Sequence, residues 1–95
     1  MTKTTTPQQL AAGFGLLANP TRLAILQRLT DSPRNVSATG KAMGLKQPLT
    51  SYHLGLLRMG RLIVGVRRGK SMMYQVHAAG MKELADALAP LMPRR

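Results

Sequence analysis

Hydrophobic side chains between residues 47 and 59 recur at the spacing of an α-helix. The apolar positions are Leu49, Leu54, Leu56, Leu57 and Met59. A polar flank runs beside them, formed by Gln47, Thr50, Ser51, Tyr52 and Arg58. This pattern predicts an amphipathic helix over 47–59 that buries its apolar stripe and leaves the polar flank in solvent.

Beyond Gly60 the apolar period changes to the alternation of β-strands. One strand face would carry Leu62, Val64 and Val66, and one face of the next would carry Met72, Tyr74 and Val76. Between the strands lies Arg67-Arg68-Gly69-Lys70, a tight turn in which Gly69 can take the positive φ that a hairpin demands. The sequence therefore predicts a β-hairpin over 61–76 with three cations at its tip.

The rest of the chain predicts a flexible arm over 1–7 and helices over about 8–18, 20–29, 37–43 and 79–92. Asn19 and Pro20 suit an N-cap and a first helical position, Gly44 suits a helix stop, and Pro90 should end or kink the last helix. We expect one domain over 8–92, mainly α with a β-hairpin wing. A helix followed directly by a basic hairpin is the order of parts in a winged helix-turn-helix.

The first and last predicted helices both carry apolar stripes. These are Leu10, Phe14 and Leu17 on the first, and Met81, Leu84 and Leu88 on the last. Gly13 and Gly15 each weaken the first helix by roughly 1 kcal/mol relative to Ala, so packing must hold it. A chain of 95 residues also has a thin core. We expect the two helices to pack together and to leave part of their surface for a second subunit.

Charge narrows the range of partners. The chain has 14 Lys and Arg against 3 Asp and Glu, a net charge of +11. From Ser32 to Lys82 there is no carboxylate, whereas nine Lys or Arg fall in that range. Such an imbalance favours an anionic partner, nucleic acid first and a membrane surface second. The positive charge is concentrated where the predicted helix and hairpin lie.

The sequence lacks the signals of several other classes of protein. The chain has no Cys, its polar start MTKTTTPQQ is unlike a signal peptide, and no apolar run reaches the ~18 residues of a membrane span. We expect a cytoplasmic, nucleoid-associated protein.

A Gly-rich phosphate loop, a His and carboxylate cluster and a GxSxG motif are also missing. Ser51, Tyr52 and His53 are consecutive on a helix, so they point about 100° apart and cannot converge on one substrate atom. We expect no enzyme activity.

Three segments together resemble the ArsR/SmtB family of bacterial transcriptional regulators. They are LANPTRLAIL at 17–26, GLKQPLTSYHLGLLRMGRLI at 44–63 and VRRGKSMMYQV at 66–76. The resemblance covers about residues 10–90. It implies a dimeric winged-helix repressor that places its fourth helix in the major groove and dimerises through its first and last helices. It also implies release of DNA on binding a metal or another inducer, whose identity the sequence leaves open.

The chain departs from the family at both usual metal sites. Asn35-Val36-Ser37-Ala38-Thr39 replaces a Cys-containing motif, and His77-Ala78-Ala79-Gly80 replaces an Asp and His pair. We expect no metal and no cofactor; the alternative is an intersubunit site using His77 and Glu83. Thr39-Gly40 replaces a usual Leu-Ala pair, which predicts a short or loosely packed third helix. Lys46 replaces a usual Ser, which removes an N-cap but adds a cation.

We expect contacts to double-stranded DNA at a pseudo-palindromic operator. The predicted DNA-binding residues are Lys46, Gln47, Thr50, Ser51, Tyr52, His53, Arg67, Arg68 and Lys70. For His53 the other interpretation is a packing histidine, for Tyr52 a cover over the helix–hairpin junction, and for the three hairpin cations a solvated tip. Two alternative functions stay open: a protein-interaction module that uses the winged fold, and a non-specific nucleic-acid-binding protein.

Overall fold

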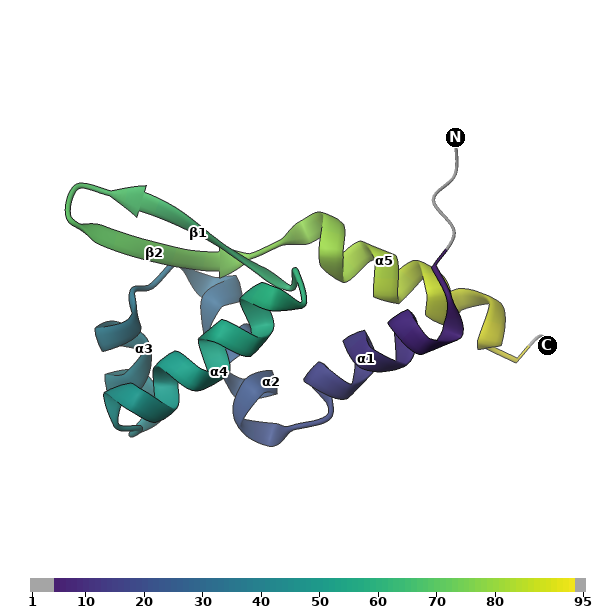
Figure 1. Cartoon of the computed structure of the whole chain (residues 1–95), viewed down its shortest axis with the longest axis horizontal. Coiled ribbons are helices and arrows are strands. Elements are labelled where there is room, and N and C mark those ends of the chain that lie inside the picture. Colours follow the sequence, from purple (N-terminus) through teal and green to yellow (C-terminus); the bar gives the residue numbers. More distant parts are fainter. Residues whose placement is uncertain (1–4, 94–95) are drawn as a thin grey trace.

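The computed structural model describes residues 5–93, and these form helices and one antiparallel hairpin (Figure 1). In chain order the elements are α1 (Pro7–Leu17), α2 (Pro20–Asp31), α3 (Val36–Met43), α4 (Gln47–Met59), β1 (Ile63–Arg68), β2 (Ser71–Val76), α5 (Ala78–Leu88) and the 3-10 helix η1 (Ala89–Leu91). The predicted mainly α fold with a β-hairpin wing is confirmed, and α4 has the predicted bounds.

Thr6 fixes the start of α1. Its hydroxyl accepts a hydrogen bond from the Gln9 backbone N–H at 3.1 Å, and the Gln9 side-chain oxygen accepts the Thr6 N–H at 2.9 Å. This reciprocal capping box makes Pro7 the first helical residue, inside the range predicted as a flexible arm. Residues 1–4 of that predicted arm lie outside the described residues.

The predicted helix boundaries at Asn19 and Gly44 are confirmed, whereas the last helix ends at Leu88 and not at residue 92. The Asn19 side chain accepts the Arg22 N–H at 3.0 Å and starts α2. Gly44 ends α3 in the left-handed conformation, with φ 68°. The last helix changes at Leu88 to the 3-10 turn that contains Pro90, because proline has no N–H to continue the α-helical hydrogen bonds.

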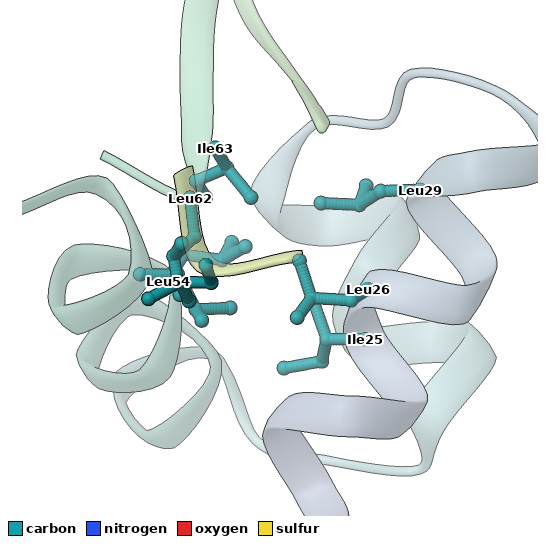
Figure 2. Packing of buried hydrophobic residues seen from close by; sticks show 8 residues of the cluster. Ile25, Leu26, Leu29, Leu54, Leu62 and Ile63 are labelled. Atoms are coloured by element: carbon teal, nitrogen blue, oxygen red, sulfur yellow. The ribbon is translucent and has the colours of Figure 1, made fainter. Parts of the chain in front are cut away.

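The core lies between α2, α4 and the start of the hairpin (Figure 2). Its buried side chains are Ile25, Leu26, Leu29, Leu54, Leu57, Leu62, Ile63 and Leu84. Leu84 is the contribution of α5, so this helix is tied into the same core as α2 and α4. The core therefore fixes α4 and the hairpin relative to one another.

The predicted alternation places Val64 and Val66 on one face of β1, and the strand register shows which face meets the core. Residues that pair across an antiparallel ladder share a face, and here Ile63 pairs with Val76 and Gly65 with Tyr74. This face meets the core, since Ile63 is buried and Tyr74 and Val76 pack against the core. Val64 and Val66 therefore face the other side, and Val66 is exposed. The apolar period was right for the strand, but the core lies on the side of Ile63.

The third helix is short, as expected, but loose packing was wrong. Thr39 is fully buried and donates its hydroxyl proton to the Asn35 carbonyl at 2.8 Å. Gly40 is buried as well, and a Cβ there would lie 3.0 Å from the Leu45 carbonyl oxygen and from Oγ1 of Thr50. The small residue allows α3 to approach α4 closely, which fixes the helix-turn-helix pair.

The molecule is elongated, with extents of 45 × 29 × 24 Å and a radius of gyration of 14.5 Å. A compact domain of this length would have a radius of gyration of about 12 Å. Figure 1 shows the reason: the hairpin projects at one end, and α1 and α5 lie side by side at the other. Within residues 5–93, none of the helices is long and apolar enough to cross a membrane.

Candidate nucleic-acid interface

The exposed face of α4 carries Gln47, Ser51 and Tyr52. The spacing of four residues from Gln47 to Ser51 puts both on one side of the helix, and Tyr52 adjoins them. Tyr52 is 59% exposed. Lys46, at the N-cap, is also exposed and makes no side-chain cap hydrogen bond, as its replacement of Ser predicts. Hydrogen-bonding groups therefore line the start of α4.

Thr50 and His53 are buried instead of lying on this face. The Thr50 side chain is 0% exposed and donates its hydroxyl proton to the Lys46 carbonyl at 2.9 Å. His53 is 8% exposed. Their burial argues against the predicted direct contact of Thr50 and His53 with DNA.

The buried face of α4 is rotated relative to the apolar stripe. It consists of Thr50, His53, Leu54 and Leu57, whereas Leu49 and Met59 are exposed. Two polar residues thus occupy core positions, and two of the apolar residues lie in solvent. The interpretation of His53 as a packing histidine agrees with this burial.

His53 contacts an arginine of α2. Nδ1 of His53 lies 3.4 Å from a terminal guanidinium nitrogen of Arg22. Burial lowers the pKa of His53 below its usual value, and the positive charge of Arg22 lowers that pKa further. The hydrophobic pattern does not single out Arg22. A cation near the start of a helix usually lies in solvent, so the sequence gives no sign of its contact with His53.

The hairpin tip is the basic part of the candidate interface. Gly69 has φ 59° and begins the two-residue turn, which is the backbone role predicted for it. Arg67, Arg68 and Lys70 are exposed on either side of this glycine. Within residues 5–93 the ion pair is Lys82 with Asp86 on α5, and no carboxylate pairs with the hairpin cations. Their charge is free to meet an anion.

His77 holds the start of α5 against the end of α4. Its Nδ1 lies 3.0 Å from the Arg61 carbonyl oxygen, so Nδ1 carries the proton and donates it. The His77 backbone N–H also donates to the Leu62 carbonyl at 2.9 Å. In the described part of the chain, no three His, Asp or Glu side chains gather in a metal-binding cluster.

The residues of the predicted dimer surface differ in their exposure. Leu84 is buried within its own chain, whereas Leu88 is 46% exposed. Leu10, Phe14, Leu17 and Met81 are half-buried. Leu91 and Met92 continue the exposed apolar surface past Leu88. The dimer residues predicted from the sequence ended at Leu88 and did not include these two.

Comparison with known proteins agrees with this geometry. A family described as "Helix-turn-helix domain" matches residues 17–66. The HTH-type transcriptional regulator NmtR of Mycobacterium tuberculosis is 36% identical over 78 residues, which are 82% of this chain and 65% of NmtR. The HTH-type transcriptional repressor SmtB of the same organism is 37% identical over 60 residues, 63% of this chain and 44% of SmtB.

The chain belongs to the ArsR/SmtB family of helix-turn-helix regulators. It spans less than two thirds of the length of these two curated relatives. A solved structure of the homodimeric winged helix-turn-helix DNA-binding domain of Mb0332 from Mycobacterium bovis has a TM-score of 0.74 and 26% identity. That match covers 96% of this chain and 90% of the Mb0332 domain, so the winged fold extends over nearly all of the ArsR/SmtB family member described here.

Proposed function

We propose that this ArsR/SmtB family member is a sequence-specific DNA-binding transcriptional regulator that acts as a homodimeric repressor. The observation that supports it best is the pairing of two surfaces. A helix face with Gln47, Ser51 and Tyr52 exposed lies on the same rigid core as a hairpin with three unpaired cations. Amide and hydroxyl groups can read base edges in the major groove, and cations bind phosphate.

In this proposal the start of α4 enters the major groove and the hairpin reaches the neighbouring backbone. Gln47 and Tyr52 contact base edges, Ser51 supports them, and Lys46 contacts a phosphate beside the groove. Arg67, Arg68 and Lys70 contact phosphates and the edge of the minor groove. These groups fit the general division in which phosphate contacts position a protein and base contacts give its specificity.

A second copy of the chain completes the proposed regulator. One reading helix contacts few base pairs, and a two-fold dimer places two such helices about 34 Å apart on a pseudo-palindromic operator. The exposed apolar side chains of Leu88, Leu91 and Met92, together with the half-buried stripe of α1, form the proposed dimer surface. The homodimeric state of the Mb0332 domain supports this assembly. We place the dimer in the cytoplasm, on the nucleoid, because its proposed partner is there.

A competition experiment tests the proposed function. The purified chain is titrated against a labelled duplex from its own promoter, with unlabelled promoter DNA or random DNA of equal length as competitor. A sequence-specific regulator is displaced by promoter DNA at much lower concentration than by random DNA. Equal displacement by both competitors supports the non-specific nucleic-acid-binding alternative. No binding to either DNA at low salt supports the protein-interaction alternative.

A further inference from the structure

Arg22 connects the end of α1 to the helix that carries the candidate reading face. Its Nε donates to the Leu16 carbonyl at 2.7 Å, and a terminal nitrogen of the same guanidinium lies 3.4 Å from Nδ1 of His53. The backbone N–H of Arg22 donates to the Asn19 side chain, which fixes the start of α2. Arg22 of α2 thus contacts both α1 and α4 through its side chain.

This contact determines the protonation state of His53. A guanidinium has only donors, so Nδ1 of His53 must be the acceptor. His53 is therefore neutral in this arrangement, with its proton on Nε2. Protonation would add a hydrogen to Nδ1, remove the acceptor and place two positive charges together.

His53 in turn contacts the exposed face of its helix. The rings of Tyr52 and His53 have centroids 5.3 Å apart and planes inclined by 65°, an edge-to-face arrangement. Tyr52 is one of the residues that we expect to contact bases. A series of direct contacts therefore runs from the Leu16 carbonyl through Arg22 and His53 to Tyr52.

We propose that Arg22 and His53 are positioning residues that hold Tyr52 and the start of α4 in the orientation required for operator recognition. This inference rests on the proposed DNA-binding function. Neither residue touches DNA in this role. Arg22 holds the ring of His53, and the ring of His53 supports that of Tyr52.

The charged surroundings of His53 give the contact a dependence on pH. Arg22 of α2 is the charged group that faces the ring, and α4 itself contributes the phenol ring of Tyr52. The His53 ring forms no hydrogen bond or ion pair with the cations of the neighbouring elements, which are Lys41 of α3 and Arg67 and Arg68 of β1. Within residues 5–93 it forms none with a carboxylate either. No nearby acid can stabilise the protonated ring, so acid breaks the contact with Arg22.

The expected change in DNA affinity has an unusual sign. Adding a positive charge to a DNA-binding protein ordinarily strengthens its binding to phosphate. Breaking the interaction between Arg22 and His53 should instead weaken operator binding while leaving random-DNA binding at least as strong. Specificity should therefore decrease as pH falls.

The chain has two histidines, and this allows a matched test. H53Q keeps a side-chain oxygen that can accept from Arg22 but does not titrate. H77Q leaves His53 as the titrating ring and serves as the control. Operator and random-DNA affinities are measured for the wild type, H53Q and H77Q between pH 8 and pH 5.5 at constant salt. The operator duplex is the promoter fragment from the competition experiment.

Wild type and H77Q should lose operator affinity severalfold over this range, whereas H53Q should stay level. A third variant, H53L, cannot accept a hydrogen bond and should bind the operator more weakly than H53Q at pH 8. An equal loss in H53Q and wild type on acidification would overturn the proposal. So would a level wild-type profile.

A measurement without DNA separates this inference from the proposed function. In H77Q the imidazole resonances of His53 are followed by NMR from pH 8 to pH 5, together with the ring resonances of Tyr52. Tyr52 signals that shift with the midpoint of His53 support the contact series, even if the wild type shows no preference for promoter DNA. Tyr52 signals that do not move while His53 titrates overturn it.

Discussion

Gly13 of α1 packs directly against Leu84 of α5. A Cβ on Gly13 would lie 2.8 Å from Cδ2 of Leu84, so the Leu84 side chain packs directly against the backbone of α1 at this point. Gly15 lies two residues further on, and a Cβ there would meet nothing within 4 Å. The two glycines look alike in sequence, but only at Gly13 does close packing explain why a residue without a side chain is needed.

This difference predicts unequal stabilities for two alanine substitutions. Gly15→Ala should raise the free energy of unfolding by about 0.5–1 kcal/mol, because alanine favours the helix and finds open space. Gly13→Ala gains the same helix propensity but displaces Leu84 from the core, so it should be less stable than Gly15→Ala. Urea unfolding at one protein concentration measures both. Equal stabilisation by the two would mean that α1 does not pack on α5 as described.

The bounds of α4 were predictable, but the orientation of its polar residues was not. Apolar spacing and Gly60 at the end together defined residues 47–59. The buried positions are then set by α2 and α3, which bring Thr50 and His53 inward. Thr50 can be buried because its hydroxyl bonds to Lys46 within the helix, and such a local bond is not visible in a hydrophobic pattern.

The hydrophobic pattern also did not predict the orientation of the hairpin or the contact made by Arg22. Alternating apolar residues occur on both faces of the first strand, because Ile63 is as apolar as Val64. The sequence pattern alone therefore did not decide which face meets the core. The contact between Arg22 and His53 joins residues 31 positions apart, and no local spacing predicts it. The exposed tip cations, in contrast, follow directly from the turn around Gly69.

A single charge on α5 should separate the proposed dimer. Leu88→Glu places a carboxylate in the exposed apolar surface, so light scattering should give the monomer mass of about 10.3 kDa at micromolar concentration. Operator binding should be lost with it. Leu23→Glu is the matched control, since Leu23 on α2 is 45% exposed against 46% for Leu88 and lies outside the proposed surface. A wild type that is already monomeric at this concentration would contradict the proposed dimer.

The lowered pKa of His53 predicts how stability changes with pH. The unfolded chain protonates His53 near its usual pKa, whereas the folded chain does so only at lower pH, because burial and then Arg22 oppose the charge. The unfolded state therefore binds more protons as pH falls below about 6.5, and stability decreases. Urea unfolding of the wild type at pH 7.5, 6.5 and 5.5 should show this decrease. In H53Q the same series should be flatter, and identical slopes would argue against a shifted His53.

Metal ions should not control DNA binding. The chain has no Cys, and the described residues bring no three His, Asp or Glu together. A tetrahedral zinc site needs three or four such ligands. We therefore expect operator affinity to be the same with and without micromolar zinc, nickel, cadmium or arsenite. If one of these ions weakens binding strongly, His77→Gln and Glu83→Gln test the alternative intersubunit site.

The hairpin and α4 should contribute differently to DNA recognition. Replacing Arg67, Arg68 and Lys70 together by Gln should weaken operator and random-DNA binding alike. It should also flatten the salt dependence by about 0.9 in log–log slope for each phosphate that the wild-type hairpin neutralises. Gln47→Ala or Tyr52→Ala should instead cost about 1–3 kcal/mol on the operator and leave random-DNA affinity nearly unchanged. Binding isotherms on both DNAs across a salt series measure all of these effects.

Two control variants make this comparison specific to the interface. Gln27→Ala removes an exposed glutamine from α2, and Lys82→Gln removes a cation from α5, so neither should alter DNA affinity beyond a small change in overall charge. If the hairpin variant lost only operator binding while the α4 variants lost both kinds equally, the two roles would be reversed. If none of these variants differed from its control, removal of the proposed DNA-binding side chains would have no effect on affinity. The α4 face and the hairpin would then not be the surface that binds DNA.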